Sequence, residues 1–153
     1  MIDVKRAERV DIPTIVDFQI KMAFETEGFE LNKGSIEKGV LAVFDDPSKG
    51  FYIVAVKQEE VIACLMLTPE WSDWRNGFFL WIQSLYVEKE FRGQGVFGLM
   101  YAYVQSQVRS SNDYKGIRLY VDLDNVLAQE VYKRIGMEES HYKMFEWIKS
   151  VSL

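Results

Sequence analysis

An arginine and two glycines stand where the chain passes from one predicted element to the next. Residues 80–87 form a largely apolar and aromatic run, which predicts a strand buried on at least one face. Arg92, Gly93, Gln94 and Gly95 follow after a short charged connection. Apolar residues then recur at helical spacing, at Val96, Met100, Tyr103, Val104 and Val108. The segment therefore predicts a strand, a glycine turn and a helix, in that order.

A turn of this kind can bind an anion. Glycines let the backbone turn tightly and approach a ligand, and the start of a helix offers unpaired N–H groups and the positive end of the helix dipole. Arg92 adds a positive charge at the same place. These features favour a phosphate group as the ligand. A turn that only joins two elements, with Arg92 solvated at the surface, is the alternative that the residues leave open.

The spacing of Gly93, Gly95 and Gly98 also fits the fingerprint of dinucleotide-binding folds. Such a fold needs further strand–helix units, whereas the segments before residue 80 are typical of successive strands joined by hairpin turns. The turn also lacks the Gly-Lys-Ser/Thr ending of a nucleoside triphosphate site. A nicotinamide-dependent oxidoreductase is therefore kept as the lesser alternative.

The elements that position this turn can be predicted from apolar spacing and helix-capping residues. Residues 2–5 alternate between apolar and polar, which predicts a short strand. Helices are predicted from Asp11 to about Thr26 and from Ser35 to about Asp45, with Asp11 and Ser35 as their N-caps. The second helix is predicted to bury an apolar stripe that consists of Ile36, Val40, Leu41 and Phe44.

Strands make up most of the remaining chain. Residues 51–56 and 61–67 predict an antiparallel hairpin, and residues 68–77 predict a longer connection to the central strand. After the central strand and its helix we expect a strand over 117–123, a helix over 126–135 and a strand over 141–148. This order predicts an α+β fold, with a mixed, mostly antiparallel twisted sheet flanked by helices and one parallel crossover.

Length and composition narrow the class of protein. A chain of 153 residues suits a single domain over residues 1–153. The net charge of −5 and a pI near 5.0 argue against nucleic-acid and anionic-membrane binding, which depend on clustered Lys and Arg. The absence of a signal core and of a membrane-length apolar run predicts a soluble cytoplasmic protein. Cys64 is predicted to be a buried, unreactive thiol, and a single histidine, His141, disfavours a metal site.

The turn and a later segment together resemble the GNAT family of N-acetyltransferases. The run from Arg92 to Val96 resembles the family's acyl-CoA pyrophosphate loop, Gln/Arg-x-x-Gly-x-Gly/Ala. The last position of that loop is Phe97 instead of Gly or Ala, so a bulky side chain must turn away from the pyrophosphate. A helix motif of the family, Asn-x-x-Ala-x-x-x-Tyr-x-x-x-Gly-Phe, is matched by Asn125, Ala128, Tyr132 and Gly136, with Met137 in place of the final Phe.

The resemblance implies a GNAT-like domain with acetyl-CoA as co-substrate. In that family the central strand splays from the next parallel strand, and the pantetheine arm of CoA lies in the gap. The resemblance places the pantetheine contacts at Leu85, Tyr86 and Val87. It places the remaining cofactor contacts at Arg92, Gly93, Gln94, Gly95, Val96, Phe97, Asn125, Ala128 and Tyr132.

The resemblance also implies candidates for acid and base catalysis. Tyr132 is the candidate general acid, because a phenol with a pKa of about 10 can protonate a CoA thiolate, whose thiol has a pKa of about 8 to 9. Glu27 and Glu70 are the candidate bases, together with Glu25, because their segments border the acceptor side in this family. Non-catalytic roles stay open for all of these residues. Tyr132 fits a packed structural tyrosine, Asn125 fits a helix cap, and the candidate bases fit solvated surface carboxylates.

Further acidic and aromatic residues bear on the acceptor. Glu30 and Asp73 join the candidate bases in an acidic mouth that suits a cationic amine, and Gln83 is placed to orient a water molecule. Five aromatic residues are concentrated around one loop. They fit packing within the hairpin, and they also fit a wall of the acceptor pocket or a dimer contact: Trp71, Trp74, Phe78, Phe79 and Trp81.

The sequence thus predicts an acetyl-CoA-dependent N-acetyltransferase that moves an acetyl group directly to a primary amine of a small molecule or a protein. It is expected to act as a monomer or homodimer, without a metal, a nucleic-acid partner or a membrane. A catalytically silent acyl-CoA-binding module is the main alternative, and the departure at Phe97 is compatible with it.

Overall fold

The structure, a computed structural model, describes residues 1–28 and 30–150. The chain divides into two compact units, residues 1–119 and 120–153, and each unit is described by itself. The predicted domain bounds of 1–153 include residues 29 and 151–153, which lie outside the described residues.

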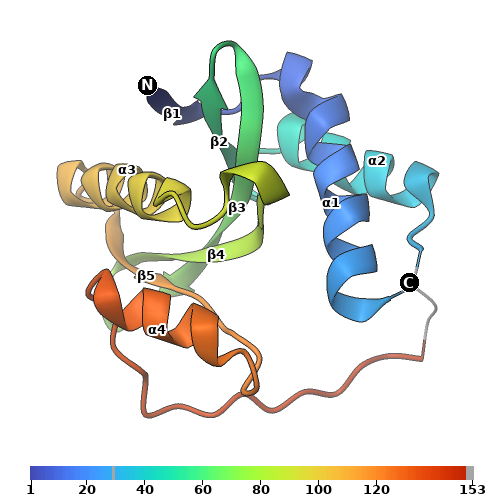
Figure 1. Cartoon of the computed structure of the whole chain (residues 1–153). Helices are drawn as coiled ribbons and strands as arrows, with labels where there is room; N and C mark the ends of the chain where they lie inside the picture. Colours follow the sequence, from blue (N-terminus) through green and yellow to red (C-terminus); the bar gives the residue numbers. More distant parts are fainter. Residues whose placement is uncertain (29, 151–153) are drawn as a thin grey trace. The chain divides into compact units, whose positions relative to one another are not determined.

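The first unit contains a sheet, three α-helices and two short 3-10 turns (Figure 1). In chain order its elements are β1 (Ile2–Arg6), η1 (Arg9–Asp11), α1 (Ile12–Glu27), α2 (Lys33–Asp45), β2 (Phe51–Lys57), β3 (Glu60–Ser72), β4 (Gly77–Val87), η2 (Lys89–Phe91), α3 (Val96–Ser110) and β5 (Tyr114–Arg118).

The strands of the described residues form one five-stranded sheet in the order β1-β2-β3-β4-β5. The first three pairings in this order are antiparallel, whereas β4 and β5 run parallel. Parallel neighbours need a crossover connection, and α3 supplies it. The predicted α+β fold, with a mixed and mostly antiparallel sheet around one parallel crossover, is confirmed.

The sheet of the first unit is covered on both faces. Tyr52 and Val54 of β2 belong to a buried cluster with Ile15 and Phe18 of α1. Ile53, which lies between them, points to the other face and is equally buried. Figure 1 shows α1 and α2 on one side of this sheet and α3 on the other. Because both sets of alternate residues are covered, the central strands read as continuous apolar runs.

Asp11 is the N-cap residue of α1, as predicted, but without a side-chain bond to that helix, and the predicted N-cap of the second helix, Ser35, is wrong. The Asp11 carboxylate does not cap α1, because its Oδ2 accepts a hydrogen bond of 2.8 Å from the backbone N–H of Glu8 and closes η1. Asn32 caps α2, and its Oδ1 accepts a bond of 3.0 Å from the N–H of Ser35. The helix therefore starts at Lys33, before Ser35.

The predicted inward stripe of the second helix is also partly wrong. Val40 is buried as predicted, but Leu41 is 40% exposed. Adjacent helix positions point about 100° apart, so a narrow contact with the sheet buries only one of two neighbouring residues.

The predicted long connection over residues 68–77 is wrong. β3 continues to Ser72 and β4 already begins at Gly77, so the two strands extend as one long hairpin. Trp71 pairs with Phe78 across the strands, and their ring centroids lie 4.9 Å apart in an edge-to-face arrangement. Cross-strand aromatic contacts stabilise this end of the hairpin, and they depend on pairing that local sequence patterns do not reveal.

The predicted strand over residues 117–123 lies too far along the chain. β5 covers Tyr114–Arg118, where it pairs in parallel with residues 78–81 of β4. Leu123, which the pattern places on a buried face, is 90% exposed. The position of β5 is therefore set by its partner strand and not by its own apolar alternation.

The second unit contains one described helix, α4 (Val126–Arg134), as predicted to within a residue. The strand predicted over residues 141–148 is wrong, because these residues are in no strand. Phe145 is 92% exposed and Trp147 is 88% exposed. Apolar content alone does not make a strand, since a strand also needs a hydrogen-bonded neighbour.

Candidate functional site

β4 carries a bulge in its second half. Cys64 of β3 pairs with Tyr86 and Met66 pairs with Gln83, so β4 has one more residue than β3 over this stretch. Ser84, within it, has a φ of 53°, in a region that residues other than glycine seldom adopt. The Ser84 carbonyl accepts a hydrogen bond of 3.2 Å from Nε2 of the buried Gln19. Bulges redirect backbone groups and are frequent beside active sites.

One edge of β4 is free beyond the bulge. Pairing with β5 ends at Trp81 and Arg118, and among the described residues no strand pairs with residues 82–87 on that side. On its other side β4 stays paired with β3 as far as Val87. Backbone groups of β4 can therefore bind an extended ligand as an added strand would. Leu85, Tyr86 and Val87, predicted from the sequence, lie in this stretch.

The glycine turn follows directly after this free edge. Gly93 has a φ of 74° and Gly95 has a φ of 77°, a left-handed conformation that favours glycine. Gly95 is the N-cap of α3 and, as a glycine, has no side chain that could cap the helix. The predicted order of strand, glycine turn and helix is thus confirmed, and the start of α3 follows a turn of the kind that binds anions in other proteins.

Phe97 lies in the first turn of α3. Its ring packs against Tyr101 one turn later, with the ring centroids 6.1 Å apart. The side chain therefore runs along the helix, in agreement with the expectation that it must turn away from a ligand at the turn.

Arg92 makes specific contacts at the start of the turn. Its Nε donates a hydrogen bond of 2.8 Å to the carbonyl oxygen of Val87. One terminal nitrogen donates a bond of 2.7 Å to Oε2 of Glu25, in the last turn of α1. The other oxygen of Glu25 accepts from the Tyr86 hydroxyl at 3.2 Å and lies 3.6 Å from Nζ of Lys89. One carboxylate thus holds two cations and a phenol beside the turn.

These contacts shift the ionisation of Glu25 and Tyr86. Partial burial is the largest single effect on Glu25 and favours its neutral form, but the hydrogen bond and charge of Arg92, the Tyr86 hydroxyl and the charge of Lys89 outweigh it. The pKa of Glu25 therefore lies below its ordinary value. Burial, with the nearby charges of Glu88 and Glu25, raises the pKa of Tyr86. Glu25 is thus an anion and Tyr86 a neutral donor at neutral pH.

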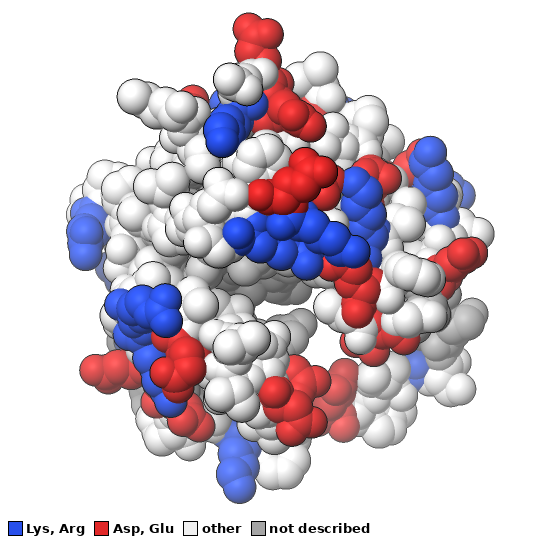
Figure 2. Space-filling model, viewed as in Figure 1, with Lys and Arg blue, Asp and Glu red and all other residues white. Residues whose placement is uncertain are grey.

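Acidic and basic side chains are interspersed on the face shown in Figure 2, and blue and red groups lie side by side where Figure 1 places η2. This face has no large patch of a single sign. An anion site on it would therefore depend on local groups such as the turn and not on the overall field.

The two predicted bases lie in different surroundings. Glu27 is an exposed residue at the end of α1. Glu70 lies on β3 opposite Phe79, and its Oε1 accepts a hydrogen bond of 2.5 Å from Arg118. The guanidinium of Arg118 also lies over the Phe79 ring, 3.7 Å from its centroid. Glu70 is thus paired near the start of β4, while the bulge lies further along that strand.

The second unit carries the other predicted residues. Oδ1 of Asn125 accepts a hydrogen bond of 3.1 Å from the N–H of Ala128, so Asn125 caps α4. Tyr132 lies in the same helix and is partly buried. Burial raises the pKa of Tyr132, so its hydroxyl stays protonated at neutral pH.

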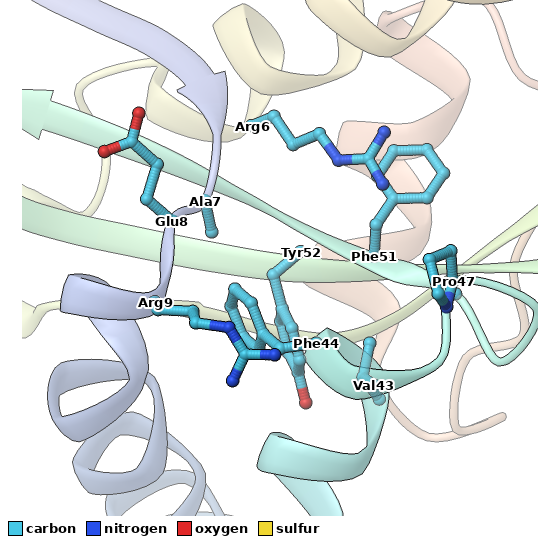
Figure 3. A pocket seen from close by; sticks show the side chains of 10 residues that line it. Arg6, Ala7, Glu8, Arg9, Val43, Phe44, Pro47, Phe51 and Tyr52 are labelled. Carbon is cyan, nitrogen blue, oxygen red and sulfur yellow. The ribbon is translucent and has the colours of Figure 1, made fainter.

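A separate cavity of about 330 Å³ lies beside β1, α2 and the start of β2 (Figure 3). The guanidinium of Arg6 stacks on the ring of Phe51 at 4.3 Å, and Arg9 forms an ion pair of 2.6 Å with Asp45. None of the residues predicted for cofactor binding or catalysis lines this cavity.

Within residues 1–28 and 30–150, no group of three or more His, Cys, Asp and Glu side chains is arranged to hold a metal ion. In the same part of the chain, every helix is too short or too polar to cross a membrane.

Sequence patterns did not reveal the bulge or the contacts of Glu25. Ser84 is a polar residue within the apolar run of β4, and this interruption is the signal that could have indicated a bulge. The sequence indicates Glu25 only as a candidate base. Its contacts could not be predicted, because Tyr86 and Arg92 lie 61 and 67 residues away from it along the chain.

Comparison with known proteins assigns the chain to a family. The model of the acetyltransferase (GNAT) family matches residues 15–137. Since this match spans most of the chain, the chain belongs to the GNAT family of acetyltransferases. The family resemblance that the sequence indicated is thereby confirmed. No curated protein matches the chain.

Solved structures share the fold. A possible acetyltransferase from Clostridium difficile 630 is 41% identical, with a TM-score of 0.91 over 97% of this chain and 98% of that one. An aminoglycoside N-acetyltransferase in complex with CoA is 13% identical, with a TM-score of 0.78 over 99% and 96% of the two chains. An aminoglycoside acetyltransferase from an uncultured soil metagenomic sample, in complex with sisomicin, is 14% identical, with a TM-score of 0.74 over 97% of each chain.

Proposed function

We propose that this protein is an acetyl-CoA-dependent N-acetyltransferase that transfers the acetyl group directly to a primary amine. The observation that carries the proposal is the edge of β4 beyond its pairing with β5, which is followed by a glycine turn with Gly95 as the N-cap of α3. An extended arm can pair with the free edge while a phosphate group binds the N–H groups of the turn. Membership of the GNAT family supports acetyl-CoA as the donor.

The proposed cofactor contacts are those that the family resemblance indicates. Pantetheine pairs with the backbone of Leu85, Tyr86 and Val87, and the turn holds the pyrophosphate. The full set of turn contacts is Arg92, Gly93, Gln94, Gly95, Val96 and Phe97. Asn125, Ala128 and Tyr132 of α4 complete the site. One aminoglycoside acetyltransferase of this fold is solved with CoA, which agrees with CoA as the cofactor class.

In the proposed reaction the amine nitrogen attacks the carbonyl carbon of the thioester, and the carbon–sulfur bond breaks. The CoA thiolate that leaves takes a proton from the Tyr132 hydroxyl, and the proton released by the amine passes to Glu27 or Glu70, or to water. Burial raises the pKa of Tyr132, so the phenol is neutral when the thiolate forms and can donate a hydrogen bond or a proton to the leaving sulfur. No covalent enzyme intermediate is required, and alignment of the two substrates supplies much of the rate.

Of the two proposed bases, Glu27 has the stronger support. The carboxylate of Glu70 is already engaged in an ion pair with Arg118 and is therefore less accessible to a substrate amine. We propose a cationic amine as the acceptor, since acidic side chains such as Glu27 and Glu30 stand near the end of α1. An acetyltransferase of this fold is solved with sisomicin, an aminoglycoside, and this agrees with a polyamine-like acceptor.

The proposed enzyme works as a single functional domain over residues 1–153, in the cytoplasm, as a monomer or homodimer. The test is release of free thiol from acetyl-CoA in the presence of a panel of primary amines, with the acetylated products identified by mass spectrometry. An N-acetyltransferase yields thiol and acetylated amine in equal amounts. CoA binding without any product would instead identify a silent acyl-CoA-binding module, and heat stabilisation by NAD but not CoA would favour an oxidoreductase.

A further inference from the structure

Glu25 is a carboxylate that joins two cations beside the glycine turn. It lies 2.7 Å from a terminal nitrogen of Arg92 and 3.6 Å from Nζ of Lys89, and its side chain is 23% exposed. Tyr86 donates a further hydrogen bond of 3.2 Å to it. These partners come from η2, the turn and β4, whereas Glu25 belongs to α1. The cationic charge beside the proposed phosphate site is therefore already partly neutralised within the protein.

A phosphate group at the turn would meet this carboxylate. The N–H groups of Gly95 and the first turn of α3 attract an anion, and Arg92 immediately precedes the turn. Arg92 already uses its Nε on Val87 and one terminal nitrogen on Glu25. A pyrophosphate and Glu25 are both anions and both favour the same guanidinium, so they compete for it.

We propose that Glu25 is an internal competitor of the CoA pyrophosphate. In the free protein Glu25 pairs with Arg92 and Lys89. When CoA binds, these two cations leave Glu25 and pair with the phosphates. Glu25 thereby weakens CoA affinity and couples the last turn of α1 to occupancy of the turn. This inference rests on the proposed function, because it takes the glycine turn as the CoA pyrophosphate site.

The test is a calorimetric titration of CoA into the wild-type protein and the Glu25→Gln variant. Glutamine keeps an oxygen that can accept hydrogen bonds from Arg92 and Tyr86, but it removes the negative charge. Removing one like charge a few ångströms from the phosphates is expected to tighten CoA binding about tenfold. Pantetheine, which has no phosphate, is expected to bind both proteins equally.

Asp17→Asn is the matched control. Asp17 lies two turns earlier in α1 and pairs with Lys21, at 2.9 Å, so the variant removes the same charge from the same helix without touching Arg92. CoA affinity in this variant is expected to change less than twofold. Equal tightening in Asp17→Asn and Glu25→Gln, or equal tightening for pantetheine and CoA, would overturn the proposal.

The outcomes separate this inference from the proposed function. If the wild-type protein binds CoA and Glu25→Gln binds it equally well or more weakly, Glu25 is not a competitor, while the proposed function stands. If the wild-type protein does not bind CoA at all, both fail.

A carboxyl-carbon NMR titration of the wild-type protein needs no substitution. Saturating CoA is expected to raise the pKa of Glu25, because Arg92 and Lys89 leave it. An unchanged pKa would overturn the inference.

Discussion

Tyr132 is the residue on which the proposed chemistry most depends. Replacing Tyr132 by Phe removes the hydroxyl and keeps the ring, so the helix should pack as before. We expect kcat to fall about a hundredfold or more, since a positioned acid contributes about 10² to 10⁴ in rate. CoA affinity, measured by calorimetry, should change little. The exposed Tyr142 offers a matched control for loss of a phenol, and an undiminished kcat in Tyr132→Phe would show that another group protonates the thiolate.

Cys64 provides a test of burial at the level of a single side chain. It is completely buried on β3, and burial raises the pKa of its thiol to about 12. A raised pKa keeps the thiol neutral, and a neutral thiol is a poor nucleophile. We therefore expect no reaction of the native protein with a thiol reagent at about pH 8 and full reaction after unfolding. Rapid labelling of the native protein would mean that β3 opens readily.

Several individual residues of the site could be predicted from the sequence because the relevant pattern is local. Gly93 and Gly95 fall within a few residues of the strand and helix that they join, and their left-handed conformations agree with that prediction. The pairing of Arg92 with Glu25 could not be predicted, because it spans 67 residues and depends on how α1 packs against the end of β4.

At the level of elements, the central strand, the glycine turn and the helix were predictable from apolar periodicity. The long hairpin of β3 and β4 was not, because residues 68–72 acquire strand structure through pairing with residues 77–81. β5 was placed too late for the same reason, since its register is set by β4. The apolar periodicity of the sequence thus identifies an element that buries one face. A strand also depends on a hydrogen-bonded partner strand, which can lie far away in the sequence.

The glycine turn can be tested by one substitution. In Gly95→Ala the new Cβ meets no atom within 4 Å, so only the left-handed φ of 77° opposes it. We expect a loss of about 1 kcal/mol in the free energy of unfolding and weaker CoA binding as the turn distorts. Denaturant unfolding and calorimetry measure the two effects.

Gly98→Ala is the matched control for the turn. This glycine lies in α3, has no left-handed φ and also has open space around its Cβ position. Alanine should stabilise the helix by about 0.5 to 1 kcal/mol. Equal effects of the two substitutions on stability and CoA affinity would contradict the conformational role of Gly95.

At the level of the whole molecule, the proposed CoA contacts fall in two stretches of the chain. The turn belongs to residues 1–119, whereas Asn125 and Tyr132 belong to residues 120–153. Titration with CoA is therefore expected to shift the backbone amide NMR signals of residues 85–97 and of residues 125–132 at the same ligand concentrations. Shifts confined to the first group would mean that α4 takes no part in binding.

The central claim is that the chain moves an acetyl group from acetyl-CoA to an amine. The most direct measurement is incubation of the purified protein with acetyl-CoA and an aminoglycoside and polyamine panel, with simultaneous detection of free thiol and acetylated product. We expect both to appear in equal amounts, and we expect Tyr132→Phe to slow their formation. Absence of acetylated product from every amine, under conditions where CoA binding is saturated, would contradict it.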